Sequence, residues 1–407
     1  MFILTALRGV RDHHYRDRLV ERFGFTRLKF STSPIWIHAA SVGEVQAAIP
    51  LIKRLLENTE QRPVLVTTTT PTGAARVQAV FAQRVQHAFL PYDTVGAVRR
   101  FLRRVQPQSL VIIETELWPH LLKACVMHQI PIVLASARIS ARTALRYRFL
   151  RSLFSDVLPK ISVAAQTIED AQRYFMLGAI PDRTQVVGNL KFDIEVAESI
   201  LTAGQQIKLS VRHRPIWIAG STHAGEEELV LQAHRQVLMH QPDALLILVP
   251  RHPQRFAQVM QLLTTQQCKF VIRSAGQIPT SAHSVWLIDT LGELMSFYAA
   301  SDVAFVGGSL VPIGGHNLLE PAALSLPVVT GSSVFNAPDI AARLHEHAAL
   351  SQVDSAQALA ERVAILLSSP PERTRMGSAA LHAVWQSRGA LNKALDLIRL
   401  QCRIHLP

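Results

Sequence analysis

Short apolar runs alternate with amphipathic stretches along almost the whole chain. Residues 64–67, 110–113 and 132–135 are such runs in the first half, and residues 245–249 and 303–306 in the second. Near-continuous apolar runs are typical of parallel strands covered on both faces, and the stretches between them have the spacing of helices. The pattern predicts an α/β fold built on parallel sheets.

The two halves of the chain open in nearly the same way. PIWIHAAS (34–41) precedes a helical pattern over residues 43–56, and PIWIAGST (215–222) precedes one over residues 225–238. Each opening predicts a buried strand, a tight turn and an amphipathic helix. We therefore expect two Rossmann-like parallel-sheet domains facing a cleft, the first over residues 1–195 and the second over residues 196–407. The last helix could pack back on the first domain.

The composition suits this organisation. A chain of 407 residues, 48% of them hydrophobic, is too long for one core and long enough for two. Its three cysteines, Cys125, Cys268 and Cys402, are too scattered for a disulfide framework or a zinc site, which fits a reducing compartment. No D-x-D or H-E-x-x-H pattern occurs, so we expect no metal.

Positive charge is concentrated in the first part of the chain. Residues 1–160 hold 23 Lys and Arg against 10 Asp and Glu, whereas the remaining residues hold 19 against 20. The partner should therefore be polyanionic. Nucleic acid is disfavoured because aromatic residues are only 6% and zinc-finger, RNP and helix-turn-helix signals are absent. The expected partner is therefore an anionic membrane surface or a phosphorylated glycolipid.

The chain begins with an apolar stretch, residues 1–7, followed by Arg8, Arg11 and further arginines. The stretch is too short to span a membrane, and no small-residue cleavage site follows it. It could lie in a membrane interface with its apolar tip in the lipid, or form an ordinary packed helix with a solvated face. The residues leave both interpretations open.

Two glycine pairs lie in residues 305–320, FVGGSLVPIGGHNLLE, directly after an apolar run. Asn317 and Glu320 come behind the second pair, in a stretch that reads as the first turns of a helix. Glycines let a ligand approach the backbone closely, and the amides at a helix start can hold an anion. We expect a phosphate site here, with Glu320 on a ribose diol. Two ordinary loops are the alternative.

Glu44 follows the first predicted strand in the segment HAASVGE, residues 38–44. Ser41 and Glu44 have the spacing of a capping box, in which the glutamate reaches back to the backbone of the serine. Alternatively, Glu44 is a general base at the cleft and takes the proton from a bound hydroxyl. The spacing alone favours the cap.

Other charged residues follow predicted strands, where open α/β sheets bind ligands. Glu114 and Glu116 could bind cations, position sugar hydroxyls or raise a neighbouring pKa, or they could complement a helix dipole. Lys191, Arg251 and His252 offer positive charge near the proposed phosphate site, although each is also a common surface residue.

Two further segments of the second half have expected roles. The amides around Gly292 could hold the edge of a nucleobase. The three acids at positions 226–228 are expected only to complement the dipole at a helix start.

At these motifs the chain resembles the 3-deoxy-D-manno-octulosonic acid (Kdo) transferases of lipopolysaccharide biosynthesis. The segments that carry the resemblance extend over nearly the whole chain: HAASVGE (38–44), TTTTPTG (67–73), ETELWP (114–119), ARIS (137–140), GNLKFD (188–193), GSTHAGEE (220–227), LVPRHPQR (248–255), DTLGEL (289–294) and FVGGSLVPIGGHNLLEPA (305–322).

The resemblance implies the GT-B fold and an inverting transfer of Kdo from CMP-Kdo to a lipid A precursor (lipid IVA), with no cofactor and no metal. By motif, Glu44 would be the base that activates the acceptor hydroxyl, and Glu114 or Glu116 would assist. Lys191 would lie near the donor's carboxylate or phosphate. The residues expected around the donor are Lys191, Ser221, Arg251, His252, Gly292, Glu293, Leu294, Ser309, Gly315, Asn317 and Glu320.

The implied partners are CMP-Kdo, a phosphorylated lipid A precursor and the anionic inner-membrane surface, with no nucleic acid. The implied location is the cytoplasmic face of the bacterial inner membrane, where the chain would be peripheral or weakly anchored. Family members commonly begin with an apolar anchor, but here only residues 1–7 precede the basic segment. Anchoring would then rest on the basic surface and a short insertion, or the true start would lie upstream.

Two alternatives to this function remain from the residues. One is a GT-B enzyme that uses another nucleotide sugar, such as a UDP-sugar. The other is a basic membrane- or nucleic-acid-binding protein on a Rossmann scaffold, without a nucleotide site. The number of Kdo residues transferred is not predicted by the sequence.

Overall fold

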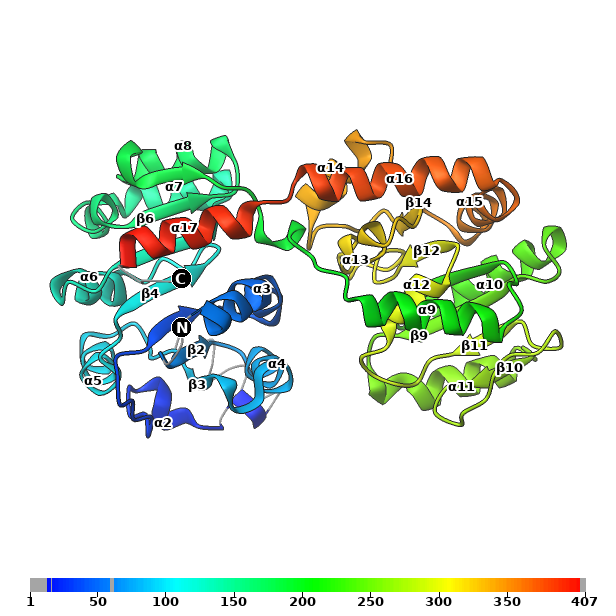
Figure 1. Ribbon diagram of the computed structural model, residues 1–407, viewed down its shortest axis with the longest axis horizontal. Coiled ribbons are helices and arrows are strands. Elements are labelled where there is room, and N and C mark those ends of the chain that lie inside the picture. Colours follow the sequence, from blue (N-terminus) through cyan, green and yellow to red (C-terminus); the bar gives the residue numbers. More distant parts are fainter. Residues whose placement is uncertain (1–12, 16, 59–61, 403–407) are drawn as a thin grey trace. The chain divides into compact units, whose positions relative to one another are not determined.

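The computed structural model describes residues 13–15, 17–58 and 62–402. The apolar stretch 1–7, with its predicted role at a membrane, lies outside the described residues. The chain divides into two compact units (Figure 1). The first unit contains the residues up to Asp193 together with those from Ser387 on, and the second contains Ile194–Gln386.

The first unit is built on a seven-stranded sheet in which every neighbouring pair is parallel. The strand order is β3-β2-β1-β4-β5-β6-β7. The strands are β1 (Ile35–His38), β2 (Val64–Thr68), β3 (Gln86–Phe89), β4 (Ser109–Ile113), β5 (Ile132–Ala137), β6 (Ser162–Ala165) and β7 (Thr184–Val186).

Helices cover both faces of the first sheet. Successive side chains of a strand point to opposite faces, so Trp36 lies in one apolar core and its neighbours Ile35 and Ile37 lie in another. The helices are α2 (Leu19–Arg22), α3 (Val42–Asn58), α4 (Pro71–Phe81), α5 (Val95–Val105), α6 (Pro119–Met127), α7 (Ala141–Phe149), α8 (Ile168–Leu177) and α17 (Ala390–Cys402).

The last helix, α17, packs in the core of the first unit, although the chain reaches it through the second. Its residues Leu391, Leu395 and Ile398 are buried in the same core as Ile35 and Ile37. The Asp193 carboxylate accepts hydrogen bonds from the amides of Gly389 and Leu391, both at 2.8 Å. Asp193 therefore holds the start of α17 at the point where the chain leaves the first unit.

The second unit repeats the plan with another parallel seven-stranded sheet. The strand order is β10-β11-β9-β8-β12-β13-β14. The strands are β8 (Ile216–Thr222), β9 (Leu245–Pro250), β10 (Phe270–Ile272), β11 (Val285–Leu287), β12 (Val303–Val306), β13 (Val328–Gly331) and β14 (Leu350–Val353).

Apolar cores lie on both faces of this second sheet as well. Trp217 belongs to one core, and Ile216 and Ile218 belong to the other. The helices are α9 (Glu198–Ser210), α10 (Glu226–His240), α11 (Phe256–Thr265), α12 (Leu294–Ala300), α13 (Leu319–Ala323), α14 (Pro338–Glu346), α15 (Ala356–Ser368) and α16 (Pro370–Gln386). None of the described helices of either unit is both long enough and apolar enough to cross a bilayer.

Candidate active site

Glu44 lies in the first turn of α3, directly after β1. Its carboxylate accepts a hydrogen bond from the Ala40 amide at 2.6 Å and one from the Ser41 hydroxyl at 3.2 Å. The Ser41 hydroxyl in turn accepts from the Glu44 amide at 3.4 Å. The contacts resemble a capping box, but the backbone partner is Ala40, one residue before the expected one.

Glu114, Glu116 and Lys191 lie at the same carboxyl edge of the first sheet. Glu114 directly follows β4, with φ at 62° and its amide bonded to the carbonyl of Ala135 at 3.0 Å. The ammonium of Lys191 pairs with the Glu114 carboxylate at 2.7 Å. Lys191 was expected beside the donor phosphate, in the company of residues 305–320. Lys191 belongs to the first unit, and its partner there is Glu114.

Two of the acids at this edge, Glu44 and Glu116, have a raised pKa, and burial is the main cause. Burial, and then the charges of Glu116 and Glu114, raise the pKa of Glu44 from 4.5 to about 8. Burial also raises the pKa of Glu116, and Glu114 adds to that effect. Perturbed carboxyl groups at a ligand-binding edge are candidates for proton transfer. The Glu44 carboxyl group can therefore both cap α3 and exchange a proton near neutral pH.

In the second unit, a carboxylate occupies the glycine loop that was expected to hold a phosphate. Glu226, at the start of α10, is fully buried. Its two oxygens accept hydrogen bonds from the amides of Gly308, Ser309 and Leu310 at 2.6, 3.0 and 2.9 Å, and from the His223 amide at 3.2 Å. The predicted anion seat at the first glycine pair is therefore already taken, by the chain's own carboxylate.

The acids 226–228 were also interpreted wrongly as simple complements to a helix dipole. Glu227 is fully buried like Glu226. It accepts a hydrogen bond from the Thr222 hydroxyl at 3.1 Å and pairs with Arg255 at 3.2 Å. Burial raises the pKa of Glu227, and Arg255 opposes that shift. Only Glu228 is exposed at the helix surface, so two of the three acids hold neighbouring segments together.

Ser309, expected beside the donor, instead holds the loop. The side chain is fully buried. Its hydroxyl donates to the Val306 carbonyl at 2.6 Å and accepts from the Gly331 amide at 2.8 Å. A Cβ atom added to Gly331 would lie 2.2 Å from the Ser309 carbonyl, so only glycine lets β13 approach this loop. The Ser309 side chain has no exposed surface with which to contact a ligand.

A cluster of histidines lies beside the glycine loop. The Nε2 atoms of His223 and His316 are 2.8 Å apart, and their rings are stacked. His252 meets the His223 ring edge-on, with centroids 5.1 Å apart. A Cβ atom at Gly308, whose φ is +69°, would lie 3.0 Å from the His316 ring. The second glycine of the first pair is therefore required for contact with this cluster.

Positive charge dominates the surroundings of the histidine cluster. Burial and then Arg251 lower the pKa of His316 to about 4. Burial, His252 and Arg251 lower the pKa of His223. Arg251 follows β9 and is exposed. Among the described residues its guanidinium forms no ion pair, so the group can receive an anion.

The remaining predicted donor residues lie at or near the carboxyl edge of the second sheet. Asn317 accepts a hydrogen bond from the Leu319 amide at 3.1 Å and donates to Glu320 at 3.2 Å, so the two side chains bind each other. The helix that follows them, α13, is only five residues long. The Gly315 amide donates to the Gly308 carbonyl at 2.8 Å, which joins the two glycine pairs.

Ser221 and residues 292–294 complete the set. Ser221 lies at the end of β8 with φ at 59°. Gly292 has φ at 88°, and Leu294 begins α12. Glu293 pairs with Arg273 at 2.7 Å, and this ion pair lowers its pKa. The Glu293 carboxylate is therefore held in place by an arginine and stays partly exposed.

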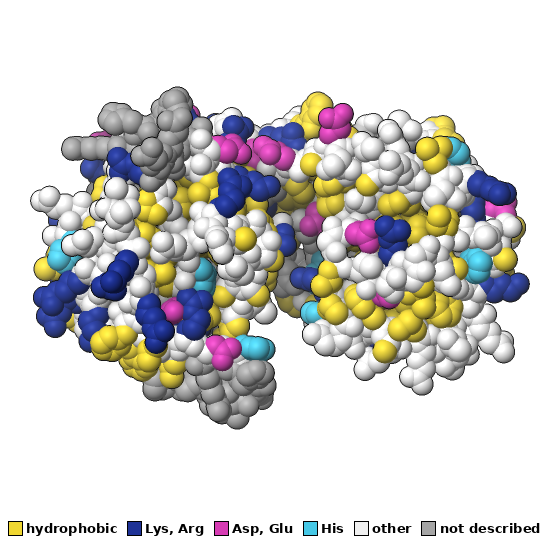
Figure 2. All heavy atoms as spheres, turned by 60° about the horizontal axis from the view of Figure 1, so that its bottom comes forward, with side chains coloured by type: hydrophobic (Ala, Val, Ile, Leu, Met, Phe, Trp, Pro, Cys, Tyr) yellow, Lys and Arg dark blue, Asp and Glu magenta, His cyan; other side chains and the backbone are white. Residues whose placement is uncertain are grey.

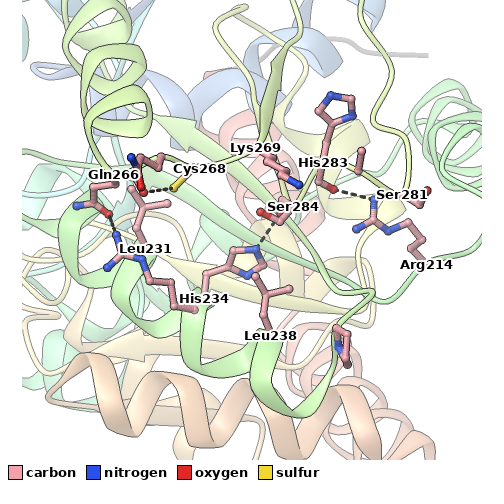
Figure 3. A pocket seen from close by; sticks show the side chains of 14 residues that line it. Arg214, Leu231, His234, Leu238, Gln266, Cys268, Lys269, Ser281, His283 and Ser284 are labelled. Atoms are coloured by element: carbon pink, nitrogen blue, oxygen red, sulfur yellow. Dashed lines mark hydrogen bonds between the residues drawn. The ribbon is translucent and has the colours of Figure 1, made fainter.

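A hollow of about 420 Å³ lies at the opposite, amino edge of the second sheet (Figure 3). Arg214, Lys269 and Ser284 line it and lie one or two residues before a strand. His234, also in the hollow, accepts from the Trp217 indole at 3.1 Å and bonds the Ser284 carbonyl at 2.9 Å. Arg214 donates to four backbone oxygens. The polar groups here serve the fold, so this hollow is not the candidate site.

Sequence reasoning missed three members of the candidate site, His223, His316 and Glu226. The two histidines were part of quoted motifs but were not assigned a role. Their signal was available, because both directly follow predicted strand ends or glycine pairs. Among the described residues no three His, Cys, Asp or Glu side chains are grouped so that they could hold a metal ion.

Two units, each with a parallel sheet and candidate ligand-binding residues at its carboxyl edge, make up a two-domain fold of the GT-B class. The chain belongs to the Kdo transferase family. Residues 17–194 match the family model described as 3-deoxy-D-manno-octulosonic-acid transferase (kdotransferase), and residues 214–382 match glycosyl transferases group 1. The protein is therefore a Kdo-transferring glycosyltransferase.

Individual relatives agree with the family models. The 3-deoxy-D-manno-octulosonic acid transferase of Haemophilus influenzae is 43% identical over 97% of this chain and 93% of its own length. That of Bordetella pertussis is 38% identical over 90% and 87%. Among solved structures, UDP-GlcNAc 2-epimerase from Neisseria meningitidis bound to UDP-GlcNAc has a TM-score of 0.60 at 13% identity, covering 90% of this chain and 99% of that one. This last likeness concerns the fold alone.

Proposed function

We propose that this protein transfers Kdo from CMP-Kdo to a hydroxyl group of a phosphorylated lipid A precursor, lipid IVA, with inversion at the anomeric carbon. The observation that carries the proposal is the Glu44 carboxyl group. It is held at a strand end by Ala40 and Ser41, and burial, followed by the charges of Glu116 and Glu114, raises its pKa to about 8. A base with such a pKa can take a hydroxyl proton near neutral pH.

In the proposed reaction, the oxygen of the acceptor hydroxyl attacks the anomeric carbon of Kdo. Deprotonated Glu44 accepts the proton of that hydroxyl at the same time. The bond from that carbon to the phosphate oxygen of CMP breaks, and CMP leaves with the electron pair. A single displacement of this kind inverts the configuration. The ion pair between Lys191 and Glu114 lies at the same edge and would orient the acceptor, with Glu116 assisting.

On the donor side, Arg251 and the histidine cluster would meet the anionic groups of CMP-Kdo. Two observations support this. The Arg251 guanidinium has no ion-pair partner among the described residues, and the pKa values of His223 and His316 are lowered. Burial is the main cause of the lowered pKa values, and the charge of Arg251 adds to it, so an incoming phosphate or carboxylate would meet positive potential here. Asn317 and Glu320 would contact the nucleoside. CMP-Kdo is treated as a substrate, and we propose no cofactor or metal.

The acceptor would be met at the cytoplasmic face of an anionic inner membrane. The net charge of +13 over residues 1–160 supports this part of the proposal. Figure 2 shows Lys and Arg side chains lying among exposed hydrophobic ones on one face of the first unit. Such a mixture suits a surface that approaches anionic lipid.

The test is turnover of CMP-Kdo with lipid IVA, followed by mass spectrometry, which also counts the Kdo residues added. We expect product masses that rise in steps of one Kdo unit, and nuclear magnetic resonance of the product should give the inverted configuration. Binding of CMP and UDP should be compared in parallel. Preference for UDP, or absence of Kdo-containing product, would reject the proposed donor.

A further inference from the structure

The hollow at the amino edge of the second sheet is lined by cations without any acidic side chain. Its volume of about 420 Å³ is in the range of pockets that hold small molecules. All of its 14 lining residues belong to the described part of the chain, and none is Asp or Glu. Arg214, Arg235 and Lys269 are among them. A cavity lined by charge of one sign concentrates ions of the opposite sign.

This positive charge contrasts with the charge of the unit that contains the hollow. Residues 194–386 hold 12 Lys and Arg against 15 Asp and Glu. Six of the 12 cations form ion pairs with described residues. Of the six that do not, three line this one hollow. The second unit is therefore acidic as a whole, but half of its cations without an ion pair are gathered here.

The three cations differ in how far the fold already uses them. Arg214 donates to four backbone oxygens, which fixes its position. Burial lowers the pKa of Arg214 and the charge of Asp243 opposes that shift, although Asp243 does not line the hollow. Arg235 donates to the Gln266 side chain at 2.6 Å. The Lys269 ammonium has no hydrogen bond or ion pair to any described residue, so Arg235 and Lys269 keep N–H groups for a ligand.

Apolar side chains and one thiol complete the lining. Leu231, Leu238 and Pro242 give the hollow an apolar wall. Figure 3 shows Lys269, Ser284 and His234 in the middle of the hollow, with Cys268 to one side and Arg214 to the other. Burial raises the pKa of the Cys268 thiol, and the charge of Arg235 opposes that shift. The positive charge of the hollow therefore reaches the thiol.

We propose that this hollow is a second ligand site, which binds a small organic phosphate monoester between Arg235 and Lys269 with its organic group against Leu231, Leu238 and Pro242. A phosphate monoester carries about 1.5 to 2 negative charges at neutral pH, so it can compensate both cations. A simple carboxylate would leave one of them uncompensated. Inorganic phosphate would leave the apolar wall in contact with water.

The ligand would contact α10, the helix that also supports the donor side of the candidate active site. Leu231, Arg235 and Leu238 of this helix line the hollow. At its start, Glu226 accepts from the amides of the glycine loop. The two places lie at opposite edges of the second sheet, so the second site is separate from the donor site. A ligand that binds the folded unit stabilises it, and here it would stabilise the helix that holds the glycine loop.

The test uses phenyl phosphate as the probe and the Cys268 thiol as the reporter. Iodoacetamide carries no charge, and mass spectrometry of the digested full chain measures its reaction with each cysteine separately. Cys125 and Cys402 are buried and serve as internal references. We expect phenyl phosphate to slow the labelling of Cys268 to a saturating limit, and phenol at the same concentrations to leave the labelling rate unchanged.

Two variants test the cations. Arg235→Gln and Lys269→Gln should each raise the half-saturating concentration of phenyl phosphate roughly two- to fivefold, because each removes one partly solvated ionic contact. The matched control is Arg212→Gln, which removes an exposed arginine of the same unit outside the hollow and should change nothing. The half-saturating concentration does not depend on the reactivity of the thiol itself, which Arg235→Gln also alters.

Four results would overturn the second site. They are labelling of Cys268 that phenyl phosphate does not slow, equal protection by phenol, unchanged half-saturation in both test variants, and an equal effect of Arg212→Gln. Arg251→Gln, at the opposite edge of the sheet, should keep the protection in full. Loss of protection in that variant would place the phosphate monoester in the candidate active site and would also overturn the proposal.

Discussion

Replacing Glu44 by glutamine separates the two roles of this carboxyl group, because glutamine imitates the protonated acid. The glutamine oxygen can still accept from the Ala40 amide, so the cap on α3 should survive. A glutamine cannot take a proton from a hydroxyl group. We therefore expect Glu44→Gln to abolish transfer while nucleotide binding stays near that of wild type.

The stability of the variant should depend on pH in a defined direction. The pKa of Glu44 is about 8 in the folded chain, against 4.5 for the unfolded reference. The folded state thus holds this proton to higher pH than the unfolded state, so wild type loses stability as pH rises from about 4.5 through about 8. The glutamine variant has no such proton to lose. Its stability relative to wild type should therefore increase over that window.

The size of the effect follows from the same pKa values. From about pH 6 to about pH 9, the linkage relation predicts that the unfolding free energy of the variant rises by about 2.5 kcal/mol relative to that of wild type. The Glu44 side chain is only half-buried. Screening by solvent therefore reduces the expected difference to about 1–2 kcal/mol. In a domain of this size, such a difference is a shift of a few degrees in Tm.

The assay is thermal unfolding of wild type and variant at both pH values, run beside Kdo transfer. Glu57→Gln is the matched control, because Glu57 is an exposed acid near the end of the same helix; its Tm difference from wild type should be the same at both pH values. Two results would refute the reasoning. One is residual turnover close to wild type, and the other is a Tm difference for Glu44→Gln that does not change with pH.

Three further outcomes can be measured in the second unit. Glu226→Gln should destabilise that unit by about 2–4 kcal/mol in urea unfolding, because four backbone amides lose a charged acceptor, whereas Glu228→Gln on the exposed face should cost under about 0.5 kcal/mol. Gly331→Ala should yield little folded protein, judged by circular dichroism and expression, since the added Cβ would lie 2.2 Å from a loop carbonyl. CMP should bind more tightly as pH falls, because an anion raises the lowered pKa values of His223 and His316. Calorimetry in buffers of different ionisation enthalpy should then show that the protein takes up protons when CMP binds. An affinity for CMP that does not change as pH falls would exclude these histidines from the CMP site.

Much of the fold could be predicted from the sequence, and what was missed has a common cause. The buried strands were found as apolar runs, including those at residues 64–67, 110–113 and 245–249. The strands that escaped are the edge strands of the two sheets, β3, β7, β10 and β14. An edge strand has fewer neighbours, so polar residues enter it, as Gln86 and His87 do in β3. Polar residues also interrupt β7 and β14, whereas β10 (Phe270–Ile272) is apolar but only three residues long, so none of these strands gives a clear signal in the sequence.

The sequence predicted those residues of the candidate site whose role depends on their immediate neighbours in the chain. Glu44 and the acids after β4 were found because they directly follow a buried strand. Glu226 was misjudged because its partners, the amides of residues 308–310, are more than 80 positions away in the sequence. At the start of a helix, an acid that complements the dipole and an acid that binds a distant loop have the same local pattern. Only tertiary contacts distinguish them.

The carboxylate of Glu226 changes how an anion must be bound in the second unit. The amides of a glycine loop usually attract phosphate through their partial positive charge. Here three of these amides already point at a carboxylate, so the loop offers little further attraction to a second anion. In the proposed function, side chains would then meet the charge of the leaving phosphate, and Arg251 is an exposed cation beside the histidine cluster. The glycines serve a different purpose, since they let the loop approach both Glu226 and His316 without steric conflict.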